Sequence, residues 1–102
     1  MRLNLREGVL IVAAPYRAIA DRLERVRVAY ELSQSDFARR IGVAPHTFNG
    51  WIKGDKRPGI DTALVIRREL NVSLDYLYAG DASTLSVKLH HAIRHGVPLS
   101  KL

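Results

Sequence analysis

The stretch "LSQSDFARRIGVAPHTFNGWIKGDKRP", residues 32–58, carries the signals of two short helices joined by a tight turn. Ser33 is a typical N-cap residue, and Asp36, three positions later, is a short version of the acid in a capping box. Gly42 can end the first helix, because glycine tolerates the left-handed conformation. Pro45 suits the first turn of the second helix. We therefore expect two helices, followed by the basic loop "GDKRP".

The apolar residues of this stretch are spaced as on one face of a helix. Phe37, Ala38 and Ile41 fit the inner face of the first helix, and Phe48 and Trp51 fit that of the second. Core packing explains the two aromatic residues better than base stacking does, because it accounts for their spacing. Further core residues are expected around the pair, namely Val43, Leu64, Ile66, Leu70, Val72 and Leu77.

Four more helices are predicted along the chain. A first helix begins at Pro15 and repeats apolar residues every three or four positions. Three later helices are marked by caps at their starts and by glycine or asparagine at their ends. We expect them at about Asp61 to Leu70, in "LDYLYAG" after Ser73, and around Leu85, Leu89 and Ile93. The pattern predicts an all-α fold.

The N-terminal segment, residues 1–14, has a different pattern. Leu3 and Leu5 alternate with polar residues, and an apolar run with β-branched residues extends from Val9 to Ala14. This pattern favours an extended arm or a short strand. An uncovered apolar edge is a liability, so we expect residues 3–14 to pair with the same segment of a second chain or to pack on the last helix at a dimer contact. The alternative is that this segment covers the core of its own chain.

Composition limits the possible partners. The chain has 102 residues, of which 47% are hydrophobic, and no cysteine; one packed domain without disulfides or thiolate metal sites is expected, as in a reducing compartment. Lys and Arg number 16 against 10 Asp and Glu, a net charge of +6, which favours a polyanionic partner. The longest apolar run is far shorter than the ~20 residues of a membrane span and too short for a signal peptide. We therefore expect a cytoplasmic protein that binds nucleic acid and not a membrane.

Two short helices with a glycine turn and a basic loop are the parts of a helix-turn-helix. The stretch from Leu32 to Asp81 resembles the lambda-repressor-like regulators, also called Cro/CI or XRE-type. The similarity lies in "LSQ", "A..IGV", "T...W..G..RP", "AL.I...L" and "VSLDYLY.GD", in this order. The resemblance implies a five-helix DNA-binding domain over residues 15–81, commonly used as a dimer on a pseudo-palindromic operator. The arm, residues 1–14, and an extra C-terminal helix and tail, residues 82–102, would be additions to it.

The resemblance assigns residues to DNA. Base-reading positions on the second helix of the motif are Pro45, His46, Asn49 and Gly50, and phosphate-contacting positions are Gln34, Lys53, Lys56 and Arg57. The charge pattern agrees, since residues 33–57 carry five basic side chains, Arg39 and Arg40 included, and two acidic ones. Only His46 and Asn49 offer polar groups to base edges, so we expect direct readout of only a few base pairs in each half-site.

Three residues depart from the family pattern. Arg27 stands where members carry an arginine that pairs with a glutamate, but Ile52 occupies the glutamate position. Arg27 must then find Glu24, Glu31, solvent or a phosphate. Ala44 replaces the usual Ser or Thr cap, a loss of about 1 kcal/mol, and Gly50 inside a helix costs about as much against alanine.

No set of residues indicates catalysis, a cofactor or a small-molecule effector. His91 and His95 could share a metal ion, but no third ligand accompanies them, and a solvated basic face explains them better. The expected function is therefore that of a sequence-specific, double-stranded DNA-binding transcriptional regulator, a repressor acting as a homodimer. The alternative is a protein-interaction module, such as an antitoxin-like subunit.

Overall fold

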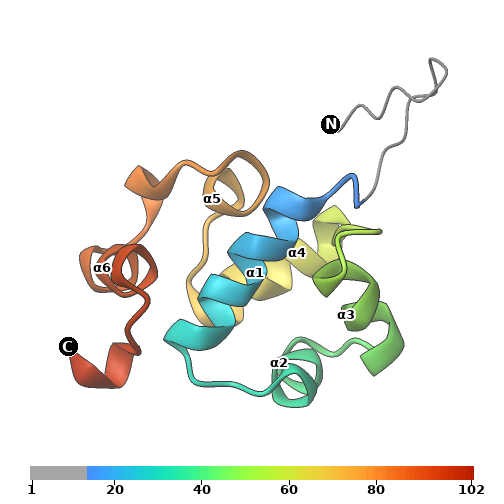
Figure 1. Ribbon diagram of the computed structural model, residues 1–102, viewed down its shortest axis with the longest axis horizontal. Coiled ribbons are helices and arrows are strands. Elements are labelled where there is room, and N and C mark those ends of the chain that lie inside the picture. Colours follow the sequence, from blue (N-terminus) through green and yellow to red (C-terminus); the bar gives the residue numbers. More distant parts are fainter. Residues whose placement is uncertain (1–13) are drawn as a thin grey trace, which may run out of the picture.

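A computed structural model describes residues 14–102, and this part of the chain is helical without any strand (Figure 1). The expected N-terminal arm lies outside the described residues. The α-helices are α1 (Arg17–Ala29), α2 (Gln34–Ile41), α3 (Pro45–Ile52), α4 (Ile60–Leu70), α5 (Leu74–Ala79) and α6 (Val87–His95). Two 3-10 turns, η2 (Ala82–Thr84) and η3 (Leu99–Lys101), flank α6. No helix in residues 14–102 is long and apolar enough to cross a membrane.

Local capping signals fix most of the helix ends. The Ser33 hydroxyl accepts a hydrogen bond from the Asp36 N–H at the start of α2, and the Ser73 hydroxyl accepts one from the Tyr76 N–H at the start of α5. Gly42 ends α2 in the left-handed conformation, with φ of 75°. Each of these ends was predicted from the sequence, because caps act within one helical turn.

The core forms where α1 meets the other helices. Leu23 and Val26 of α1 are fully buried. Phe37 of α2 packs against Phe48 of α3 with ring centroids 4.9 Å apart, and Trp51 meets Phe48 edge-on. These aromatic contacts join the two helices of the motif, as the spacing of the apolar residues predicts.

The C-terminal addition packs on the same core. Leu89 and Ile93 of α6 are buried, and α6 contacts α1. The Ser100 hydroxyl donates a hydrogen bond to Glu31 at 2.6 Å, which holds the end of the chain near the end of α1. α3 and α6 lie at opposite ends of the molecule (Figure 1). The extra helix thus packs on the same core but lies away from the motif.

Three details differ from the sequence prediction. The first helix begins at Arg17, two residues after Pro15, because the backbone before it is not helical: Ala14 has φ of 53°, and Tyr16 has φ of −111° and ψ of 35°. Leu64 was expected in the core, but it is 46% exposed. Leu85 is buried as expected, although it precedes α6.

Candidate nucleic-acid interface

The outer face of α3 carries the predicted base-reading residues. Pro45, His46 and Asn49 are exposed, and Gly50 is partly exposed. Positions four apart lie above one another on a helix, so these four residues form one continuous surface. Phe48 and Trp51, by contrast, face the core and are almost fully buried, at 1% and 4% exposure. The structure therefore brings together the residues that the sequence assigned to base reading.

The beginning of α3 lacks a side-chain cap. Ala44 occupies the N-cap with extended backbone and makes no side-chain hydrogen bond, as its methyl group dictates. Pro45 follows at the first helical position, where its missing N–H would have no partner within the helix. The first turn of α3 thus presents free backbone N–H groups and no acidic side chain.

The basic loop after α3 is fastened to the beginning of α1. Gly54 is buried with φ of +80°, and its carbonyl oxygen accepts the Tyr16 N–H. The Arg17 guanidinium donates to the carbonyl oxygen of Lys53 at 3.3 Å. Arg57 lies over the Tyr16 ring at 5.0 Å from its centroid, a cation–π arrangement. These contacts tie Lys53 and Arg57 to the beginning of α1.

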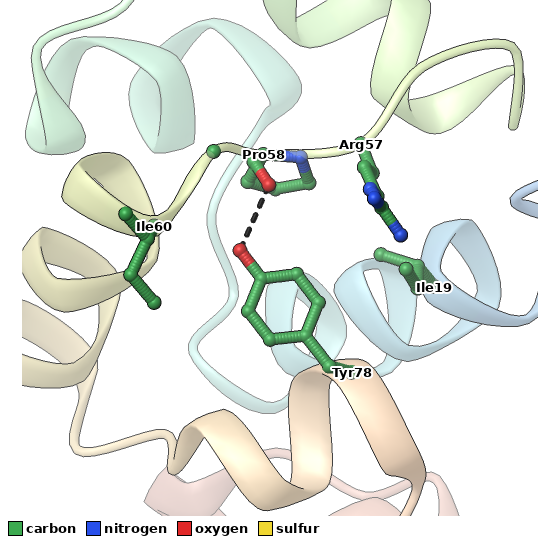
Figure 2. A pocket seen from close by; sticks show the side chains of 6 residues that line it. Ile19, Arg57, Pro58, Ile60 and Tyr78 are labelled. Atoms are coloured by element: carbon green, nitrogen blue, oxygen red, sulfur yellow. Dashed lines mark hydrogen bonds between the residues drawn. The ribbon is translucent and has the colours of Figure 1, made fainter.

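Tyr78 of α5 holds the far end of the same loop. Its hydroxyl donates to the carbonyl oxygen of Pro58 at 2.8 Å (Figure 2). Burial raises the pKa of Tyr78, while the positive charge of Arg57 acts in the opposite direction. The hydroxyl therefore stays protonated at neutral pH and can keep donating. Sequence reasoning assigned no role to Tyr78, because its partner is 20 residues away.

A hollow of about 370 Å³ lies beside this hydrogen bond. Figure 2 shows Ile60 on one side of the Tyr78 ring and Arg57 with Ile19 on the other. Ile60 is 57% exposed, and Leu64, one turn later on α4, is exposed as well. This part of α4 is an apolar surface next to a basic loop.

Ion pairs decide which basic side chains of the motif keep a free charge. Arg39 pairs with Asp36 at 2.7 Å, and Arg40 lies 3.9 Å from the carboxylate of Glu69. The loop carries three cations, Lys53, Lys56 and Arg57. None of them makes an ion pair with another residue in the range 14–102. Within residues 33–58, the cations that are free of ion pairs among the described residues thus lie in the loop, while Gln34 is exposed at the first position of α2.

Comparison with known proteins identifies the family. The helix-turn-helix family profile matches residues 23–77, more than half of the chain. The chain belongs to the helix-turn-helix family of the lambda-repressor-like, XRE type. The matched range includes both helices of the motif and ends within α5, so α6 lies beyond the family domain.

Two relatives from Bacillus subtilis are similar over this region. The uncharacterized HTH-type transcriptional regulator YobD is 32% identical over 56 residues, which cover 55% of this chain and 50% of YobD. The uncharacterized HTH-type transcriptional regulator YqaE is 28% identical over 64 residues, covering 63% of this chain and 55% of YqaE. The chain thus spans about half the length of these curated relatives. No solved structure gives a significant match.

Ile52 stands where family members carry the glutamate that pairs with Arg27. In this helix-turn-helix domain Arg27 pairs with Glu24 of its own helix instead. Its guanidinium donates to both carboxylate oxygens of Glu24, at 2.7 and 3.1 Å. A third bond reaches the carbonyl oxygen of Leu32 at 2.9 Å. The hydrogen bond to Glu24 raises the pKa of Arg27, while its partial burial acts against this. Of the partners that the sequence left open, the structure selects Glu24.

The histidines of α6 lie away from the helix-turn-helix. His91 and His95 are exposed, with ring centroids 4.4 Å apart. No group of three or more metal-ligating side chains occurs in the part of the chain that the structure describes. The pair therefore lies on a solvated face that also carries Lys88 and Arg94.

Proposed function

We propose that this helix-turn-helix protein binds double-stranded DNA sequence-specifically and regulates transcription, with α3 in the major groove. The observation that carries the proposal is the exposed polar face of α3 beside an anchored loop with three cations that are free of ion pairs among the described residues. A helix fits the major groove, and cations beside it meet the phosphates that border the groove. The regulator names of the two relatives agree with this role.

In this arrangement His46 and Asn49 contact base edges, with Asn49 best suited to adenine N6 and N7. Pro45 adds apolar contact at the start of the helix. Lys53 and Arg57 neutralise phosphates from opposite ends of the loop. Gln34, at the N-terminus of α2, hydrogen-bonds a phosphate and fixes the position of α3 in the groove.

We further propose that the protein acts as a dimer and as a repressor. One helix-turn-helix contacts too few base pairs to find its site among the many competing sites of a genome. Two copies related by a two-fold axis double the recognised sequence and match a pseudo-palindromic operator. A dimer seated on such an operator blocks access to a promoter that overlaps it.

Selection from random duplex DNA at a fixed salt concentration tests this function. We expect enrichment of one sequence with two-fold symmetry, bound with an affinity that falls as salt rises, because about 0.9 counterion is released for each neutralised phosphate. Without enrichment, and with negligible duplex affinity at low salt, the protein is not a DNA-binding regulator.

One observation favours a second candidate function, a protein-interaction module. Ile60 and Leu64 form an exposed apolar pair on α4, and such surfaces commonly mark protein contacts. The selection experiment separates the two functions. A protein-interaction module would enrich no duplex, whereas a DNA-binding dimer can use the same apolar pair without losing its affinity for DNA.

A further inference from the structure

Gly50 lies inside α3, where glycine destabilises a helix by about 1 kcal/mol relative to alanine. The structure shows what occupies the space that a larger residue would fill. A Cβ atom added at Gly50 would lie 3.8 Å from Cγ and Cδ of Lys56 and 3.9 Å from its Cβ. Three consecutive carbons of the Lys56 side chain thus run along α3 at van der Waals distance from position 50.

The backbone of the loop fixes where this side chain begins. The N–H groups of Asp55 and Lys56 both donate to the carbonyl oxygen of Gly50, at 3.1 and 3.2 Å. Lys56 is therefore held against the last turn of α3, and the clamp at Gly54 limits movement of the loop away from it. Little backbone freedom remains to be lost when the ammonium group binds a ligand.

Gly50 shares the outer face of α3 with His46, one turn earlier, and with Asn49. We propose that Lys56 supplies the base-reading group that Gly50 lacks, with its ammonium group crossing position 50 to O6 and N7 of a guanine. This inference rests on the proposed function and refines it, since Lys56 then reads a base edge and does not hold a phosphate. A side chain larger than that of alanine at position 50 would block the path of the lysine, whereas the Cβ of an alanine would only contact its stem.

The two roles of Lys56 differ in a measurable way. A phosphate contact weakens binding to every duplex equally when it is removed. A base contact discriminates between base pairs by ~1–3 kcal/mol, or roughly 5- to 150-fold in affinity, at one position of each half-site. The test must therefore compare sequence preferences and not only affinities.

The experiment is selection from random duplexes with the full chain and three single variants. Lys56→Ala should lose a five-fold or larger preference for one G·C pair in each half-site. Lys53→Ala should bind all selected sequences more weakly and keep that preference. Lys88→Ala removes the same charge from α6, at the other end of the molecule (Figure 1), and should select the parent sequence with the parent affinity.

A second variant tests the path across Gly50 while Lys56 is kept. Gly50→Leu should lose the same G·C preference, because its side chain occupies the space of the lysine stem and cannot hydrogen-bond to a base. Gly50→Ala should lose less, since its Cβ only touches the stem. Thermal unfolding followed by circular dichroism checks that both variants remain folded.

The outcomes separate this inference from the proposed function. Selection of a symmetric operator by the parent, together with an unchanged preference in Lys56→Ala, would overturn the role of Lys56 and leave DNA binding intact. Failure of the parent to enrich any duplex would overturn the proposed function itself. A preference lost in Lys56→Ala but kept in Gly50→Leu would show that the lysine reaches the base by another path, which also contradicts the inference.

Discussion

Replacement of Gly54 by alanine tests the clamp between the basic loop and α1. Gly54 is left-handed, with φ of +80°, a conformation that costs an alanine about 1–2 kcal/mol. The new Cβ would also lie 3.2 Å from both N and Cα of Arg17. These are backbone atoms at the first turn of α1, so relief of the contact requires the loop to move.

Movement of the loop weakens the hydrogen bond from the Tyr16 N–H to the Gly54 carbonyl oxygen, now 2.8 Å long. Loss of such a bond costs about 0.5–1.5 kcal/mol. The cost of the left-handed conformation and the loss of this hydrogen bond add up. Gly54→Ala should therefore lower the free energy of unfolding by about 1.5–3.5 kcal/mol. Gly42→Ala is the matched control, because Gly42 has nearly the same φ, +75°, but no atom within 4 Å of an added Cβ. That control should lose only the backbone contribution, about 1–2 kcal/mol.

Urea unfolding of the parent and both variants, analysed at a common m-value, measures the difference. We expect Gly54→Ala to be less stable than Gly42→Ala by about 0.5–1.5 kcal/mol. Equal losses in the two variants would refute the reasoning, because the close approach of Gly54 to Arg17 would then contribute nothing to the position of the loop.

Four further predictions concern the basic loop, the outer face of α3 and the N-terminal arm. Arg57→Ala and Lys53→Ala should each reduce the slope of log affinity against log salt by about 1; fluorescence anisotropy on one duplex measures the slope, and an unchanged slope removes that residue from the phosphate contacts. Tyr78→Phe should lower the free energy of unfolding by about 1 kcal/mol, because the Pro58 carbonyl oxygen loses its donor; a variant as stable as the parent argues against that anchor. Asn49→Ala should relax the preference at one base position of each half-site, and a selected operator identical to the parent's excludes Asn49 from base reading. Deletion of residues 1–13 should give a folded monomer in sedimentation, and a deletion variant that stays dimeric excludes the arm as the dimer contact.

The helix ends could be read from the sequence because their causes are local. The hydroxyls of Ser33 and Ser73 find their N–H partners three residues away, and Asn71 turns left-handed where α4 ends. Pro15 shows the limit of such rules. It could begin a helix by its own geometry, but the backbone of Tyr16 is not helical, with φ of −111° and ψ of 35°, and its N–H bonds to Gly54, which is 38 positions later in the chain. A rule about single residues does not include such long-range contacts.

The prediction that Leu64 lies in the core was wrong for a related reason. On α4 the buried face consists of Ala63, Ile66 and Leu70, which already satisfy the three- and four-residue spacing. Leu64 is adjacent to this face, and the small side chain of Ala63 occupies the buried position. Periodicity alone cannot decide between two neighbouring apolar residues of different size. The exposed leucine beside Ile60 is therefore a property of the tertiary structure.

For the candidate site, the sequence predicted which residues share the face of α3 but not which charges are free. Arg39 and Arg40 add to the basic count of the motif, yet both have carboxylate neighbours in the fold. The contact of Lys56 with Gly50 could not be foreseen either, because it depends on how the loop returns along the helix. Local rules locate the motif, and the contacts of the folded chain decide which of its cations are paired.

The inner face of α3 explains why its outer face can break two helix rules. The missing cap at Ala44 and the glycine at position 50 each cost about 1 kcal/mol. Phe48 and Trp51 are almost completely buried, and burial of a large apolar side chain contributes about 1.5–3 kcal/mol. The two aromatic residues therefore hold α3 in place whatever its solvent side contains. This separation leaves the outer surface free to carry proline, histidine, asparagine and glycine, although these residues contribute little to helix stability.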